Sequence, residues 1–179
     1  MNPAAPLMDQ YRFLARYNAW FNQRLYDACE QLSEPERQRG RAAFFGSLQA
    51  TLEHILWGDK VWLARFAAQG VDFPMLGGGL LDLPASAAND RVLHLGWAEL
   101  RRQRQALDAA IEEWTAQMPP GFALSVMQYA NTQGVQRAHP AWQALTHFFN
   151  HQTHHRGQAT ALLMQAGVDV GVTDLIALV

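Results

Sequence analysis

Apolar residues recur every three or four positions through four long segments of this chain, and that recurrence restricts its fold. In the first segment the recurring residues are Leu14, Tyr17, Phe21, Leu25 and Cys29. An α-helix turns about 100° per residue, so this spacing gathers the apolar side chains into one stripe. Amphipathic helices of roughly 20 to 30 residues bury such stripes against one another in a four-helix bundle. The sequence therefore predicts an all-α protein.

Helix starts, helix ends and breaker residues divide the chain further. We expect helices over residues 9–32, 47–68, 88–117 and 140–166. Ser47 is a candidate N-cap, Pro140 a first-turn proline, and Gly167 a candidate residue just past the last helix. Residues 70–85 are rich in glycine and proline and predict a loop. Residues 122–139, with a turn at 131–134, predict a short β-hairpin inserted before the last helix.

Composition predicts a single domain over residues 1–179. Hydrophobic residues make up 49% of the chain and charged residues 17%, as in ordinary globular proteins. The net charge of −2 gives no electrostatic reason to expect nucleic-acid binding. No stretch approaches the roughly 20 apolar residues of a membrane span, and residues 1–7 do not resemble a signal peptide. Cys29 is the only cysteine, which excludes an internal disulfide and fits a cytoplasmic location.

The last predicted helix carries four of the seven histidines: His147, His151, His154 and His155. Positions 151 and 155 lie about 40° apart around a helix and about 6 Å apart along it, so two imidazoles there can bind one metal ion. His155 shares the apolar side of the helix, with His151 at its margin. They are the best chelating pair, and His147 with His151 is the second choice. The alternative is that these histidines are hydrogen-bonded core residues without a metal.

Two imidazoles rarely complete a site, because catalytic zinc has three protein ligands and one open position. His54 is the third candidate, since it lies at the edge of the apolar stripe of the second helix. Gly58, one turn further on, leaves room beside it. His94 and His139 lie near the ends of predicted elements and are weaker candidates.

Asp59 falls within the apolar face of the second helix, where a carboxylate needs a partner. Arg156 is a candidate partner, and the pair could be purely structural or could support the metal site. Other side chains that could assist chemistry near the metal are Tyr17, Trp62 and Gln158, although core packing and the polar helix surface explain each of them better when it is taken singly.

Four segments of the chain resemble the DinB-like family, within the DinB/YfiT superfamily of metal-dependent enzymes. They are Tyr17-Asn18-Ala19-Trp20-Phe21-Asn22, Phe45-Gly46-Ser47-Leu48 with Thr51-Leu52-Glu53-His54, Asp59-Lys60-Val61-Trp62-Leu63, and Asn150-His151-Gln152-Thr153-His154-His155-Arg156-Gly157-Gln158. The last of these is the most specific. Together they span nearly the whole chain.

This resemblance implies an up-down-down-up four-helix bundle that is often a homodimer. It also implies one divalent metal ion held by three histidines, which correspond to His54, His151 and His155. Some relatives are transferases or isomerases that use a low-molecular-weight thiol. Zinc or nickel is the favoured metal, because imidazole is a suitable ligand for both. Iron and manganese are alternatives.

Three functions remain open from the sequence. The first is a metal-dependent enzyme with a small-molecule substrate of unknown identity, in which the metal activates a bound water or thiol. The second is a non-catalytic metal-binding or stress-response protein whose metal is structural. A structural zinc has four protein ligands, and Cys29 could supply the fourth. The third is an interaction role for the six tryptophans and the apolar C-terminus.

Overall fold

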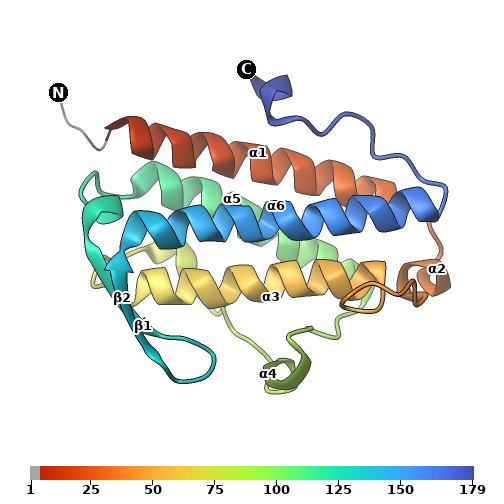
Figure 1. Cartoon of the computed structure of the whole chain (residues 1–179), viewed down its shortest axis with the longest axis horizontal. Helices are drawn as coiled ribbons and strands as arrows, with labels where there is room; N and C mark the ends of the chain where they lie inside the picture. The colour runs from red at the N-terminus through yellow and green to blue at the C-terminus, as the bar shows by residue number, and fades with distance from the viewer. Residues whose placement is uncertain (1–4) are drawn as a thin grey trace.

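The computed structural model describes residues 5–179 and is mostly helical. Within these residues it contains six α-helices and one antiparallel sheet of two strands. The four long helices are α1 (Ala5–Cys29), α3 (Leu48–Ala67), α5 (Trp97–Gln117) and α6 (Ala141–Gln165), which lie alongside one another (Figure 1). Helices α1 and α3 each contact both α5 and α6. Residues 1–4 of the expected domain lie outside the described residues.

Short elements connect the long helices. They are α2 (Glu34–Gln38), the 3-10 helix Pro74–Leu76, α4 (Ala87–Asp90), the 3-10 helix Phe122–Leu124, β1 (Val126–Ala130), β2 (Gln136–Pro140) and the 3-10 helix Leu175–Leu178. The predicted hairpin is present, with Met127 opposite His139, although its first expected residues form a 3-10 turn instead of a strand. The side-chain oxygen of Asn131 accepts hydrogen bonds from two backbone N–H groups of the turn.

The helix expected over residues 88–117 is wrong at its start, because the chain leaves the helical conformation between α4 and α5. Arg91 and His94 have φ angles of 62° and 54°, in the left-handed region. Side chains satisfy the backbone of this break: Asp90 accepts from the N–H of Val92, and Glu53 accepts from the N–H of His94 at 2.6 Å. The break is thus stabilised partly by a carboxylate from α3, which the local sequence does not reveal.

Two of the three predicted helix boundaries are confirmed. Ser47 caps α3, with its hydroxyl oxygen accepting from the N–H of Ala50 at 3.2 Å. Gly167 follows α6 with φ of 80°, and the N–H of Val168 donates to the carbonyl of Leu163, as in a Schellman cap. Pro140 is not the first helical residue, because it ends β2 and stands at the N-cap of α6.

The C-terminal segment returns from the end of α6 and passes along α1 (Figure 1). Tyr17 donates its hydroxyl to the carbonyl of Thr173 at 2.7 Å, and Arg24 donates to the carbonyl of Val170. Leu175 packs partly against the core, whereas Ile176 stays 70% exposed. Within residues 5–179, every helix is too short or too polar to cross a lipid bilayer.

Candidate metal centre

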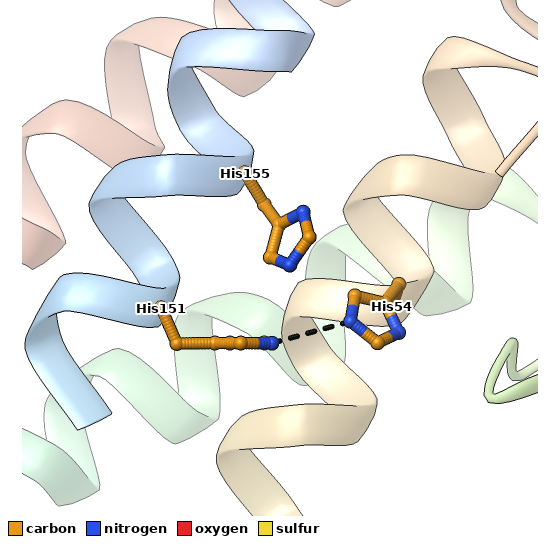
Figure 2. Close-up of side chains that lie close together, drawn as sticks. All are labelled: His54, His151 and His155. Atoms are coloured by element: carbon orange, nitrogen blue, oxygen red, sulfur yellow. Dashed lines mark hydrogen bonds between the residues drawn. The ribbon is translucent and has the colours of Figure 1, made fainter. Parts of the chain in front are cut away.

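Three histidines from two helices meet between α3 and α6 (Figure 2). His54 comes from α3, and His151 and His155 come from successive turns of α6. The Nε2 atoms of His54 and His151 are 3.2 Å apart. One ring nitrogen from each histidine lies within 4.8 Å of the other two. The structure therefore brings together the same three residues that the sequence singled out.

Hydrogen bonds at the far ring nitrogens orient two of these imidazoles. Nδ1 of His54 is 3.1 Å from the backbone carbonyl of Arg91, which can only accept, so Nδ1 is the protonated nitrogen. Nδ1 of His155 is 2.8 Å from Oε1 of Gln158, whose amide nitrogen faces Nε2 of His154. Both neutral imidazoles consequently direct an unprotonated Nε2 toward the cluster. Ring nitrogens oriented in this way by outer partners are typical of metal ligands.

Aromatic rings pack around His54. Phe45 stacks on the His54 ring with centroids 3.9 Å apart, and its edge meets His155 at 5.5 Å. The ring of Trp57 also stacks on that of His54, with centroids 5.6 Å apart. These rings fix the imidazole planes and limit the access of water to them. Phe45 belongs to a segment that marked the family resemblance, yet nothing in the sequence assigned it this contact.

Gly58 makes space for His151. A Cβ atom placed on Gly58 would lie 2.6 Å from Cε1 of His151, which is closer than real Cβ contacts. The absence of a side chain on α3 therefore lets the imidazole of α6 approach the backbone of the opposite helix. The sequence predicted room beside His54, and the structure shows that this room is taken by the ring of His151.

Replacing Gly58 with alanine is expected to displace His151 and to weaken metal binding by about 10-fold or more, as loss of a metal ligand's supporting contacts does. Gly157, in the middle of α6, has no atom within 4 Å of the equivalent Cβ position and provides the matched control. Gly157→Ala should retain metal affinity and gain about 0.5–1 kcal/mol from helix propensity. Zinc titrations monitored with a competing chromophoric chelator would measure both. Equal metal affinity in the two variants would contradict the role given to Gly58.

Burial keeps the clustered imidazoles neutral. Burial, together with the neighbouring histidines, lowers the pKa of His54 to about 4 and that of His151 to about 3. The pKa of His155 is also lowered, mainly by burial. Neutral imidazole is the form that binds metal. The three rings are thus in their ligating form at neutral pH.

These pKa shifts predict a pH dependence of folding for the metal-free protein. An unfolded histidine has a pKa near 6.5, whereas the folded pKa of His54 is about 4. The unfolded chain therefore takes up protons first as the pH falls, and stability present above pH 6.5 is lost toward pH 4. Urea unfolding after metal removal should give a midpoint that declines across this window. The decline should be shallower in His54→Gln, and an unchanged slope would contradict the assignment.

The other candidate histidines lie outside the cluster. His147 is exposed and its ring centroid is 5.9 Å from that of His151, so it neighbours the cluster without joining it. His94 pairs with Asp90 at 2.6 Å. His139 faces the hydroxyl of Tyr129 in the hairpin.

The expected pairing of Asp59 with Arg156 is wrong. Asp59 is fully buried and forms an ion pair with Arg104 of α5 at 2.5 Å, while Gln152 of α6 donates to its other oxygen at 2.8 Å. Arg156 donates instead to the side-chain oxygen of Asn18 on α1. Asp59 thus points away from the histidines, toward α5, whose arginine could not be placed from the sequence.

Asp59 belongs to a buried polar network that draws on all four long helices. Arg104 also pairs with Asp108 at 2.7 Å, and Asp108 accepts hydrogen bonds from Asn18 and Asn22 of α1. Burial raises the pKa of Asp108 to about 6, against the opposing effect of Arg104. This network, rather than the histidine cluster, lies in the buried interior between the four long helices.

Two of the side chains that the sequence analysis proposed to assist chemistry at a metal lie near the histidines. Gln158 orients His155, and Trp62 lines the cavity beside the cluster. Tyr17 lies elsewhere and holds the C-terminal segment through Thr173.

A cavity of about 370 Å³ opens beside the three histidines, between α3, α6 and the hairpin. Its walls include Trp57, Trp62 and Tyr129. This volume falls within the range of small-molecule sites, about 300–1,000 Å³. A larger cavity of about 610 Å³ is lined by Glu53 and His94 but by none of the three clustered histidines. We therefore regard the smaller cavity as the one that serves the cluster.

Comparisons with known proteins agree with this architecture. A model described as the DinB family matches residues 8–178. Protein DinB of Bacillus subtilis (strain 168) is 25% identical over an alignment that covers 93% of this chain and 92% of that protein. The crystal structure of a DinB-like protein from Bacillus cereus ATCC 10987 has a TM-score of 0.62 and 21% identity, with 88% of this chain and 91% of that chain covered. At this identity the crystal structure supports a shared fold alone.

Proposed function

Because this chain belongs to the DinB family, we propose that it binds one divalent metal ion through His54, His151 and His155 and is a metal-dependent enzyme. The reaction class that we propose is a thiol-dependent transfer or isomerisation. The observation that carries the metal site is the convergence of three neutral imidazoles on one point, with ring nitrogens within 4.8 Å of one another. Zinc or nickel is the proposed metal, since imidazole suits both.

The donor atoms of this chain fit such an ion. Nε2 of His54 and Nε2 of His151 lie 3.2 Å apart. Because Nδ1 of His54 donates its proton to the Arg91 carbonyl, Nε2 of His54 carries a free lone pair. Nδ1 of His151 is buried with no protein partner among the described residues. Without an ion, His151 can donate its Nε2–H to Nε2 of His54, whereas a cation between the rings would be bound by a lone pair from each of the three imidazoles.

Three protein ligands favour catalysis over a structural role. Within residues 5–179, the only group of ligand atoms close enough to share an ion contains these three histidines and neither a cysteine nor a carboxylate. Cys29, the candidate fourth ligand of a structural zinc, is buried at the end of α1 and outside this group. A divalent ion with an open position supplies a bound water or thiolate as the nucleophile. Phe45 and Trp57 would shield it, and the adjoining cavity would hold the substrate.

We also propose the up-down-down-up topology, one domain, and a homodimer in the cytoplasm. The colour gradient in Figure 1 has one direction along α1 and α6 and the opposite direction along α3 and α5, which supports this topology. One continuous cluster of buried apolar side chains supports a single domain. The dimer rests on the family resemblance, and the cytoplasmic location rests on the lone cysteine.

Elemental analysis of the purified protein tests the metal site. We expect about one zinc or nickel ion per chain, as in other mononuclear sites. After removal by a chelator, adding back metal at about 100 times its Kd should stabilise the fold by about 2.7 kcal/mol. No bound metal, and no thermal shift on adding zinc or nickel, would refute the proposal.

The enzymatic part has its own test. Cobalt-substituted protein should develop a sulfur-to-metal charge-transfer band when a small thiol is added, provided that the metal has an open position. A metal-loaded protein that binds no thiol and shows no spectral change would instead support the alternative of a structural metal.

A further inference from the structure

The cavity beside the three histidines contains positive groups and no negative one. Its lining includes Arg65 and Arg91, together with four histidines, and none of its lining residues is an aspartate or glutamate. Any divalent cation at the histidines would add to this positive charge. A small molecule that enters the cavity therefore meets a field that favours anions.

Arg65 is held in a fixed position at one end of this cavity. Its guanidinium carbon lies 4.6 Å from the ring centroid of Trp62 and 4.9 Å from that of Tyr129, so the cation contacts two aromatic rings that themselves meet edge to face. Tyr129 belongs to β1, and Gln69, just after α3, holds this strand through two hydrogen bonds. Its side-chain Nε2 donates to the carbonyl of Gln128, and its Oε1 accepts from the N–H of Gln128. This arrangement pre-organises the guanidinium, which reduces the entropy lost when a ligand binds.

Arg65 also lacks a protein counter-ion. Among residues 5–179 its guanidinium forms no ion pair, whereas the buried Arg104 pairs with two carboxylates. Burial lowers the pKa of Arg65, and only Tyr129 opposes that effect. A half-buried cation with unused N–H donors is poorly compensated, since partly desolvated charges are normally paired. A ligand could supply the missing partner.

Arg65 and Arg91 lie on different sides of the histidine cluster. The charge of Arg65 lowers the pKa of His147, whose ring lies between Trp62 and His151 with centroids 4.9 and 5.9 Å away. The charge of Arg91 lowers the pKa of His54 instead. Arg91 is exposed and lies in the break between α4 and α5, so Arg65 is the better ordered of the two cations.

We propose that the substrate of this site is a small carboxylate, and that the Arg65 guanidinium binds its carboxylate group while the rest of the molecule reaches the histidines. This rests on the proposed function and extends it to a substrate class. The planar guanidinium matches a carboxylate through two parallel hydrogen bonds. The walls formed by Trp57 and Trp62 accommodate a flat apolar body, and the cavity of about 370 Å³ suits a molecule of that size.

Calorimetric titration of the zinc-loaded protein with benzoate and with neutral benzamide tests this inference. Benzoate should bind at least about 10-fold more tightly than benzamide, because a charge-assisted hydrogen bond contributes on that order. Arg65→Gln should remove this preference, and Arg65→Lys should restore part of it by keeping the charge without the paired donors. Arg102→Gln, which changes an exposed arginine outside the cavity, should match the wild type.

Zinc content measured on the same samples separates the two proposals. Absence of zinc would refute the metal site, while an Arg65-dependent preference for benzoate in metal-free protein would still support the carboxylate site. Equal binding of benzoate and benzamide by zinc-loaded protein would overturn the carboxylate site alone. Tight benzoate binding that persists in Arg65→Gln would also overturn it, because the carboxylate would then contact the metal.

Discussion

Replacing His54 or His155 with alanine is expected to reduce bound metal from about one ion per chain to nearly none, since a mononuclear site with three protein ligands loses a third of them. The loss of affinity should exceed the roughly 10–100-fold that follows removal of an outer partner of a ligand. Elemental analysis after dialysis against trace zinc would measure occupancy. Because His54 and His155 come from different helices, parallel losses would place the ion between α3 and α6.

His147→Ala is the matched control for this experiment. His147 lies on the same helix, one turn before His151, but it is exposed and outside the group of converging nitrogens. This variant should retain about one ion per chain, as expected for an intact three-ligand site. If His147→Ala loses metal as completely as the other two variants, the ligand set is wrong.

Replacing Arg104 with methionine is expected to destabilise the fold by roughly 3–5 kcal/mol, as does removal of one partner from a buried ion pair. Arg104 is 2% exposed and is the ion-pair partner of both Asp59 and Asp108. Without it, two carboxylates remain in the interior near neutral pH with only neutral donors or the more distant Arg156 to offset their charge. Urea unfolding followed by circular dichroism would give the free-energy difference.

Arg102→Met provides the same chemical change on the same helix in an exposed setting. The Arg102 side chain is 69% exposed, and within residues 5–179 its only ion-pair partner is Glu99, one turn away. Its loss should leave the unfolding midpoint close to that of the wild type, because exposed ion pairs contribute little. Similar midpoints for the Arg104 and Arg102 variants would show that the buried network does not stabilise the fold.

Local helical geometry explains how much of the site could be predicted. The positions of His151 and His155 on one side of α6 follow from a spacing of four residues, and the structure places them on neighbouring turns. The inclusion of His54 depended on how α3 packs on α6, for which Gly58 was a usable signal because only a small residue admits His151. The family resemblance pointed to the same three residues.

Long-range partners explain what could not be predicted. The sequence offered Arg156 as the partner of Asp59, because helical periodicity alone could not place Arg104 of α5 opposite that carboxylate. The interruption before α5 contains no proline and is stabilised by Glu53 from another helix, so the helix was predicted too long. The same interruption presents the Arg91 carbonyl to His54, and backbone groups leave no mark in a sequence pattern.

The buried network also bears on when the chain can fold during its synthesis. Its charged and amide groups come from each long helix, and α6, which follows the other three long helices in the chain, contributes Gln152 and Arg156. A nascent chain that ends before α6 holds Asp59 and Arg104 without these neighbours and has no surface on which α3 can bury its side toward α6. We therefore expect α1, α3 and α5 to reach stable packing only after α6 has been synthesised.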